Sequence, residues 1–351
     1  MSESLHGRQM GNLKMILDAF TIGVDFGGTN LRIAAYGQSS GLLETIHLPT
    51  RIRDEREAVA ADMCQAIRKM LDRYSPQRPL AGIGIGSAGP LDLPAGILRQ
   101  PPNLPGWDGF ELRATIERTL GTSVLLENDA NVAALGESIL GAGKTLGVDS
   151  LCMLTLGTGV GGGIILHGKI WDGMTGMAGE VGHLNIWTDG IACGCGGNGC
   201  LEPYASATGV SRRAEELIRQ ERAPGLAALQ SAHPAFEARD VAALARNGDP
   251  DAQSIFEHVG RSLGIGLASL VNTLNLPLYV VGGGLANAWS LFSPALFEEL
   301  RRRSYIYRLT APVANAAGGF QRGKTYVVPA ELGPDAGLLG ACLLPFNSSR
   351  Q

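Results

Sequence analysis

Short apolar runs alternate with amphipathic stretches along the 351-residue chain. Apolar runs bounded by glycine predict buried strands, and apolar residues recurring every three or four positions predict helices. We predict strands at residues 20–25, 30–36, 80–86, 124–126, 151–156, 163–167, 278–281 and 325–328. Helices are predicted at residues 55–73, 130–140, 212–222, 240–246, 252–274, 293–303 and 335–343. Strands that alternate with helices in this way predict an α/β protein.

Two parts of the chain open with the same order of strand, glycine turn and strand. They read VDFGGTNLRIAAY at residues 24–36 and LTLGTGVGGGIILH at residues 154–167. The spacing between them is far too long for a solenoid repeat. The echo therefore predicts two similar lobes that face one another across a cleft.

The composition limits the partners and the compartment. Charged residues make up 18% of the chain, the formal net charge is -4, and no basic stripe is visible, so nucleic acid is excluded as a partner. Apolar runs fall short of the roughly 18 residues that cross a bilayer, and the first 14 residues lack the apolar core of a secretion signal. We therefore expect a cytoplasmic protein without membrane attachment.

A first glycine turn follows the strand predicted at residues 20–25. Its two glycines let peptide N–H groups point at phosphate oxygens, and a threonine adds a hydroxyl donor. The Asp25 carboxylate beside the turn could hold Mg²⁺, which prefers oxygen ligands. An ordinary hairpin without a ligand is the alternative, and the flanking aspartate and threonine favour the phosphate site. The predicted nucleotide contacts are Asp25, Gly27, Gly28, Thr29 and Asn30.

Two further glycine clusters follow strands in the second half of the chain. The first contains a formal G-x-G-x-x-G, but strand-like Ile164 follows it where a dinucleotide fingerprint needs a helix. A G-K-T at residues 143–145 fails as a P-loop, because Ser138 stands where its first glycine should be. A strand–turn–strand phosphate grip remains, with predicted contacts Gly157, Thr158, Gly159 and Gly161. Gly282, Gly283 and Gly284 end another strand, where an adenosine contact and a simple helix-entry turn are equally compatible with the sequence.

A carboxylate stands where a predicted strand meets a predicted helix, in the segment Glu127-Asn128-Asp129-Ala130-Asn131. Such junctions face the ligand cleft in open α/β sheets. Asn128 and Asp129 could bind adjacent hydroxyls, and Asp129 could accept the proton of an attacking hydroxyl. The alternative is that Asp129 only caps the following helix. The two phosphate turns nearby favour the catalytic interpretation.

The most specific pattern joins one histidine to three cysteines: His183, Cys193, Cys195 and Cys200. Three thiolates and an imidazole complete a tetrahedral zinc site without an open position, which predicts a structural ion. Glu180 and Glu202 flank this segment. A loop braced by zinc would hold both carboxylates rigidly, as a site for sugar hydroxyls requires. The solitary Cys64, Cys152 and Cys342 are expected to be small core residues.

Together these motifs resemble the ROK family of bacterial sugar kinases and repressors, and most closely its glucokinases. The matching segments occur in family order from residue 21 to 342: DFGGTN, GIGSAGP, PNLPGW, LENDANVAALGE, LGTGVGGG, AGEVGH, CGCGGNGCLE and VGGG. The resemblance implies the two-lobed, actin-like (ribonuclease-H-like) ATPase fold with a zinc-binding loop. Residues 1–133 plus 334–351 would form the smaller lobe, with the C-terminal helix returning to it, and residues 134–333 the larger one.

The resemblance also implies an activity. ATP would phosphorylate a hexose, most simply glucose to glucose 6-phosphate, with Asp129 as general base and Mg²⁺ bound to the nucleotide. The implied sugar contacts are Gly89, Asn103, Asn128, Asp129, Glu180, His183 and Glu202. His183 would serve both zinc and sugar, adenosine would lie near residues 282–284, and the chain would form a homodimer.

Several alternatives stay open at this point. N-acetylmannosamine or N-acetylglucosamine would use the same hydroxyl contacts as glucose, and polyphosphate could replace ATP. A sugar-responsive repressor needs a helix-turn-helix domain of roughly 60 residues, for which the first strand at Phe20 leaves no room. An actin-like filament or chaperone ATPase would leave the polar cluster around His183 unexplained. Residues 221–240 are expected to be a surface insertion without a catalytic role.

Overall fold

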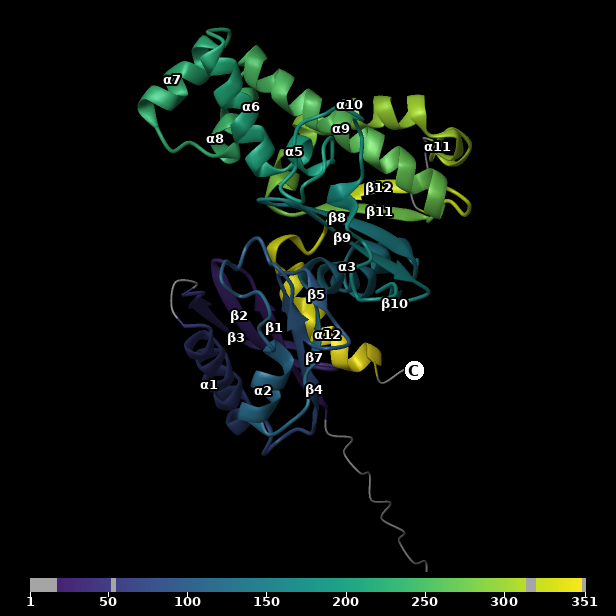
Figure 1. The fold of residues 1–351 in the computed structure, drawn as a ribbon. Helices are drawn as coiled ribbons and strands as arrows, with labels where there is room; N and C mark the ends of the chain where they lie inside the picture. The colour runs from purple at the N-terminus through teal and green to yellow at the C-terminus, as the bar shows by residue number, and fades with distance from the viewer. Residues whose placement is uncertain (1–17, 52–54, 314–319, 349–351) are drawn as a thin grey trace, which may run out of the picture.

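The computed structural model describes residues 18–51, 55–313 and 320–348. These residues form two five-stranded sheets, one above the other in Figure 1, with helices between and around them. No helix in the described residues is long and apolar enough to cross a membrane. The predicted alternation of strands and helices is confirmed.

The N-terminal sheet has the strand order β3-β2-β1-β4-β7. Its strands are β1 (Phe20–Phe26), β2 (Asn30–Gly37), β3 (Gly41–Pro49), β4 (Leu80–Ser87) and β7 (Leu125–Asn128). Strands β1, β4 and β7 run parallel, so Phe26, Ser87 and Asn128 end at the same edge of the sheet. Helices α1 (Arg56–Tyr74) and α2 (Leu112–Leu120) close one hydrophobic core, next to the small hairpin β5 (Leu91–Asp92) and β6 (Ile97–Leu98).

The C-terminal sheet has the order β10-β9-β8-β11-β12. Its strands are β8 (Leu151–Leu156), β9 (Val160–Leu166), β10 (Lys169–Ile170), β11 (Leu278–Gly282) and β12 (Tyr326–Pro329). The helices that follow these strands are α5 (Glu202–Ala205), α6 (Ala207–Arg219), α7 (Pro224–Ala232), α8 (Ala238–Arg246), α9 (Pro250–Leu274), α10 (Trp289–Arg303) and α11 (Tyr305–Thr310). Short 3₁₀ helices lie at Val181–His183, Gly284–Ala288 and Gly333–Asp335. The antiparallel β8–β9 hairpin carries the second glycine turn.

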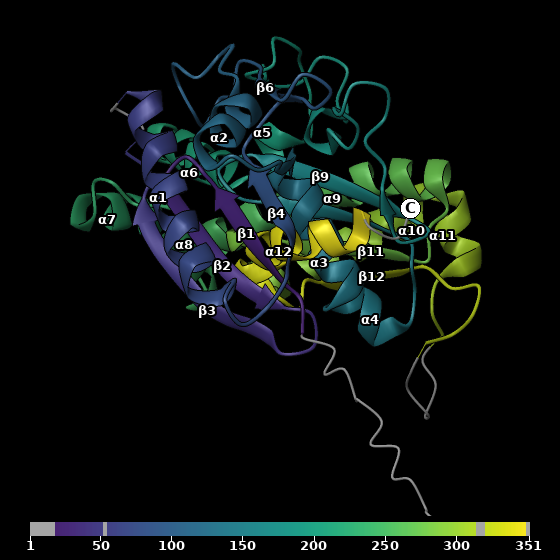
Figure 2. The same cartoon turned by 90° about the horizontal axis from the view of Figure 1, so that it is seen from below.

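Three helices lie between the two sheets: α3 (Asp129–Ile139), α4 (Ala142–Leu146) and α12 (Ala336–Ser348). Helix α12 packs against α3, β1 and β4, and Figure 2 shows it on the face of the N-terminal sheet opposite α1. The approach to α3 is close, because a Cβ at Gly340 would overlap the carbonyl group of Val132. The last described helix therefore packs against the first described strand.

The structure corrects some sequence expectations. Strands β3, β5, β6 and β10 and helices α2, α4, α5, α7 and α11 were not predicted. The helix expected at residues 212–222 begins earlier, where the Ser206 side chain accepts from the N–H of Gly209. The proline-rich residues 101–107, whose sequence predicts a surface turn, also place a side chain in the core. Trp107 is buried and contacts Phe26 with ring centroids 5.1 Å apart. The prediction that Cys64, Cys152 and Cys342 are core residues is confirmed.

Candidate active site

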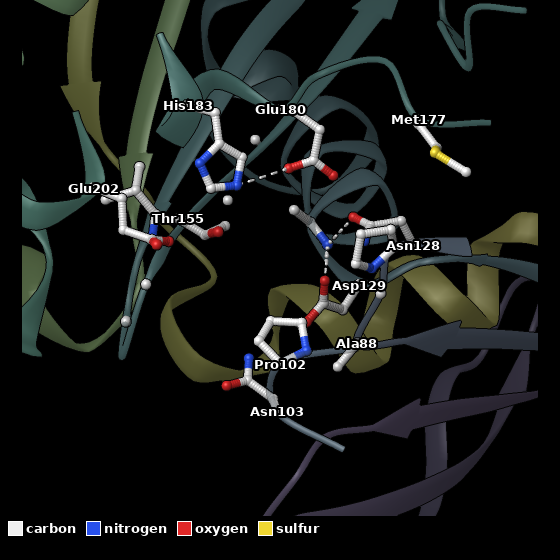
Figure 3. Close-up of a pocket in the computed structure, with 18 of the residues that line it drawn as sticks. Ala88, Pro102, Asn103, Asn128, Asp129, Thr155, Met177, Glu180, His183 and Glu202 are labelled. Carbon is white, nitrogen blue, oxygen red and sulfur yellow. Dashed lines mark hydrogen bonds and ion pairs between the residues drawn. The ribbon is translucent and has the colours of Figure 1, made fainter. Parts of the chain in front are cut away.

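A cavity of about 300 Å³ is lined by residues from the ends of both sheets. Every predicted sugar contact lines it: Gly89, Asn103, Asn128, Asp129, Glu180, His183 and Glu202. Figure 3 shows Asp129 between Asn103 on one side and the Glu180–His183 pair on the other. The four predicted contacts of the second glycine turn, Gly157, Thr158, Gly159 and Gly161, also line this cavity. Residues from distant parts of the chain therefore share one site.

At the junction of β7 and α3, one residue caps the helix and the next is the candidate base. The Asn128 side chain is the N-cap, since its Oδ1 accepts from the N–H groups of Ala130 at 2.9 Å and Asn131 at 3.3 Å. Asp129 follows as the first residue of the helix, and its Oδ1 also accepts from the Ala130 N–H, at 2.8 Å. The Asn128 amide nitrogen lies beside Gly89, where a Cβ would be 3.2 Å away. Capping by Asn128 means that Asp129 is not required for it.

The environment of Asp129 suits a base at neutral pH. Burial raises the pKa of its carboxyl to about 7, and the negative charges of Asp25 and Glu180 act in the same direction. The hydrogen bond from Ala130 N–H partly opposes this rise in pKa. A carboxyl whose pKa lies near the working pH is best placed to accept a proton in a reaction.

His183 presents one ring nitrogen to the cysteines and the other to the cavity. Its Nδ1 lies 3.6 Å from Cys193 Sγ, whereas its Nε2 lies 3.8 Å from Glu180 Oε2. The pKa of Glu180 is raised, mainly by burial and also by the charge of Glu202, while His183 lowers it. A ligand in the cavity would therefore meet an acidic side chain and the Nε2 of a histidine held from behind.

The four predicted zinc ligands, His183, Cys193, Cys195 and Cys200, are brought together with their ligand atoms within 4.8 Å of one another. The Sγ atoms of Cys195 and Cys200 are 3.7 Å apart. In a tetrahedral zinc site, bond lengths of about 2.3 Å to sulfur and about 2.05 Å to nitrogen give edges of about 3.8 Å between sulfurs and about 3.6 Å between sulfur and nitrogen. The observed separations match both edges, so this group fits a zinc ion.

Glu202 links the cysteine loop to the second glycine turn. It begins α5 directly after Cys200-Leu201, and its Oε2 accepts from the N–H of Val160 at 2.9 Å. The same carboxylate lies so close to Gly159 that a Cβ there would overlap it. Because residue 159 has no side chain, the loop that carries Cys193, Cys195 and Cys200 can contact the β8–β9 hairpin.

A second cavity of about 680 Å³ adjoins the first, and Gly157 and Thr158 line both. The Thr208 hydroxyl donates to the Thr158 carbonyl at 2.7 Å, which attaches α6 to the hairpin. Most residues that line the second cavity were not predicted from the sequence: Ala207, Thr208, Ser211, Glu237, Ala238, Arg239, Ala242, Arg246, Leu285, Asn287 and Ala288. Glu237, Ala238 and Arg239, at the end of the segment expected to be a surface insertion, line this cavity. No motif marks these residues in the sequence.

Only some residues of the other two glycine clusters, 282–284 and 27–30, line the cavities. Gly283 lines the first cavity and Gly284 the second, while Gly282 is the last residue of β11. The turn Gly27-Gly28-Thr29-Asn30 lines neither cavity. It lies at the border of the first, because a Cβ on Gly28 would overlap the backbone of Asn103.

Asp25 lies at the end of β1 and carries an ion pair with Arg32, whose Nη2 is 2.6 Å from Asp25 Oδ2. The negative charge of Asp25 contributes to the raised pKa of Asp129. Sequence reasoning also missed several walls of the first cavity: Ala88, Pro90, Leu91, Pro102, Ala130, Thr155, Val160, Gly162, Gly176, Met177 and Ala178. Among them, Ala88 and Pro102 adjoin the predicted Gly89 and Asn103, so proximity in sequence was the available signal.

Comparison with known proteins agrees with this geometry. A model of the ROK family matches residues 21–347. The glucokinase of Halalkalibacterium halodurans is 35% identical over 325 residues, which cover 92% of this chain and 94% of that protein. The structure of the ROK hexokinase from Thermus thermophilus has a TM-score of 0.76 at 34% identity and covers 94% of this chain and 99% of its own. A ROK family glucokinase from Streptomyces griseus, in complex with glucose and AMPPNP, has a TM-score of 0.73 at 33% identity, with coverages of 93% and 98%.

These similarities bear out the predicted fold class. The two mixed sheets and the cluster of one histidine and three cysteines are arranged in a fold similar to those of solved ROK kinases over almost the whole chain. Since the family model matches far more than half of the residues, and the relatives align along nearly their full length, the chain belongs to the ROK family.

Proposed function

We propose that the chain is an ATP-dependent sugar kinase and that it converts glucose to glucose 6-phosphate. The observation that carries this proposal is that one cavity holds Asp129, the polar side chains of several separate motifs and the second glycine turn. A polyol is held by hydrogen-bonding groups at fixed positions, whereas phosphate oxygens are held by peptide N–H groups. Glucokinases among the relatives support glucose as the acceptor.

In the proposed reaction, Asp129 takes the proton of the attacking sugar hydroxyl as the γ-phosphoryl group passes from ATP to the oxygen of that hydroxyl and ADP leaves. The pKa of about 7 keeps a large fraction of this carboxyl ionised at neutral pH. Glu180, His183 Nε2 and the Asn128 amide hold the other hydroxyls and orient the sugar. Closure around the substrates excludes water, which would otherwise compete as acceptor.

We propose that the nucleotide extends from the first cavity into the second. Gly157 and Thr158 line both, so the terminal phosphate would lie at the Asp129 end and adenosine against Gly284 and α8. Asp25 fits Mg²⁺, because Arg32 engages Oδ2 and the other carboxylate oxygen can serve as a ligand. When bound there, the ion would neutralise charge on the phosphates. The turn at residues 27–30 would add N–H donors from the border of the cavity.

Zinc has a structural role in this proposal. His183 Nδ1 and the thiolates of Cys193, Cys195 and Cys200 would fill all four positions of the ion, so no open position remains for chemistry. The separations between these ligand atoms support this assignment. By fixing the ring of His183 and the start of α5, the ion would hold His183 Nε2 and Glu202 in position for the sugar.

We propose that residues 1–133 with 334–351 and residues 134–333 act as the two lobes that close around the substrates. Two hydrophobic cores, one beside each sheet, support this division, and a third core around α3 and α12 joins the two sheets. In line with the family resemblance, we propose that the enzyme works as a homodimer in the cytoplasm, where the zinc-binding thiols stay reduced.

The test is a coupled assay of ADP release with glucose, mannose, fructose, N-acetylglucosamine and N-acetylmannosamine. We expect the highest kcat/KM with glucose, and the same measurement with polyphosphate decides the donor. A higher kcat/KM with an N-acetylated sugar would replace glucose by that class. Sugar binding without turnover, measured by calorimetry, would indicate a sugar-sensing regulator instead of a kinase.

A further inference from the structure

A pair of buried acidic side chains lies beside the catalytic junction and has no part in the reaction above. Glu127, at the end of β7, is 5% exposed, and its carboxyl lies within hydrogen-bonding reach of the carboxyl of Asp172, which follows β10. Its Oε1 also accepts from the N–H of Asn128 at 2.8 Å and from the Asn131 amide at 3.0 Å. The pair therefore touches the residues on either side of Asp129.

The hydrogen bonding of this pair requires a proton. Two ionised carboxylates offer only acceptors, so they cannot bond to each other. Asp172 Oδ1 is buried, and within the described chain no N–H or O–H group donates to it. Since buried acceptors without a donor are costly, one proton shared by Glu127 and Asp172 supplies the missing O–H.

The pair connects the two halves of the molecule. Asp172 opens a loop, residues 172–178, that leaves the C-terminal sheet, and its carbonyl accepts from the Ala178 N–H at 3.1 Å to close the loop on itself. Gly176, Met177 and Ala178 line the sugar cavity. A Cβ at Gly176 would be 2.5 Å from the Leu93 side chain, so the loop rests against the N-terminal half at a second point.

We propose that the shared proton of Glu127 and Asp172 is a latch that fastens loop 172–178 to β7 beside Asp129, and that Asp172 is thereby a positioning residue for the sugar. The loop continues directly into Glu180 and His183, so its attachment sets where these two side chains stand. The inference rests on the proposed function for the identity of the ligand, whereas the latch itself can be measured without any sugar.

The latch depends on pH in a defined direction. Burial raises the pKa of both groups, that of Glu127 to about 7. Asp172 faces Glu127 from the loop and the Asn131 amide faces it from α3; in the described chain no cation stands among the main influences on either pKa. The proton is held below about pH 7 and is lost as the pH rises through that value. Above it, two adjacent carboxylates repel each other and the loop loosens.

The experiment measures hydrogen–deuterium exchange of the apoenzyme between about pH 6 and about pH 8.5, expressed as protection factors. For the wild type we expect the protection of residues 172–180, including the Ala178 N–H, to fall at least about tenfold as the pair ionises. In Asp172→Asn the amide donates to Glu127 without a titrating proton, so protection should stay constant. Glu127→Gln, with the amide on the other side, should behave in the same way.

The matched control is Asp149→Asn, because that side chain is 70% exposed and lies outside the cavity walls. It should follow the wild type. Calorimetric glucose affinity, measured in parallel, should weaken more steeply with rising pH in the wild type than in Asp172→Asn, because Asp129 titrates in both proteins. Constant wild-type protection over this range, or Asp172→Asn and Glu127→Gln titrating like the wild type, would overturn the latch. If the exchange results for loop 172–178 are as expected but glucose does not bind, only the proposed substrate is overturned.

Discussion

If Asp129 is the base, the enzyme should lose activity as the pH falls through the pKa of that carboxyl. Burial, together with the charges of Asp25 and Glu180, raises the pKa of Asp129 to about 7. A base must be ionised to accept a proton, so activity is present above this pKa and is lost as the pH falls through it. An aspartate with its usual pKa of about 3.9 would instead stay ionised throughout the neutral and mildly acidic range.

The magnitude follows from the ionised fraction. With a pKa of about 7, this fraction is about 0.9 at pH 8, about 0.1 at pH 6 and about 0.01 at pH 5. We therefore expect the rate to fall about 90-fold from pH 8 to pH 5, whereas a pKa of about 3.9 predicts a fall of less than about 10%. Initial rates with glucose and ATP far below their KM values, in excess Mg²⁺, report the titration of the free enzyme. The same series in Asp172→Asn, whose loop is expected not to titrate, isolates the contribution of Asp129.

Asp129→Asn is the control for this titration. The amide oxygen can still accept the hydrogen bond that Ala130 N–H donates at 2.8 Å, so the junction should keep its shape. We expect glucose and ATP to bind this variant, turnover to fall about 10²- to 10⁴-fold, and the residual rate to lose its acid limb. A wild-type rate that stays level down to pH 5, or near-normal turnover in the variant, would remove Asp129 from the role of base.

Further predictions concern the loops and cavities around this residue. Purified protein should contain about one zinc per chain by elemental analysis, and Cys195→Ser should lose it and weaken glucose binding at least about tenfold; zinc-free wild type with full affinity would contradict this. Gly182→Ala would drive a Cβ into the Val160 carbonyl and should lower kcat/KM about 100-fold, whereas Gly194→Ala, where a Cβ meets nothing within 4 Å, should change little. Ala242→Leu fills the second cavity and should raise the KM for ATP about tenfold while glucose affinity, measured by calorimetry, stays unchanged.

Much of the site could be read from the sequence because its chemistry is carried by short segments. The predicted zinc ligands Cys193, Cys195 and Cys200 lie within eight residues, and glycines let so short a loop turn back on itself. The end of β7 and the start of α3 likewise follow from an apolar run that meets an N-cap. In such segments the neighbours along the chain are also the neighbours in space, so residue type and spacing carry the information.

Weakly patterned elements escaped prediction for a local reason. Strand β3 is an edge strand with mostly half-buried residues, and α2 buries only Leu112 and Ile116. Strand β3 shows no strong hydrophobic period. Helix α2 does space Leu112, Ile116 and Leu120 four residues apart, but it has only nine residues, too few for the period to stand out. Trp107 was misjudged because proline and glycine around it indicate a turn, while the aromatic neighbours that bury it, such as Phe26, come from a distant strand.

The sequence by itself determined the strands that precede each glycine turn, the zinc ligand set and the candidate base. Only the tertiary structure decided that Asn103 lies against Gly28, that residues 237–246 line the cavity next to Thr158, and that Glu127 meets Asp172. The physical reason is that these contacts join segments far apart in the chain. They are selected by the packing of whole sheets and helices, which local spacing and propensity do not encode.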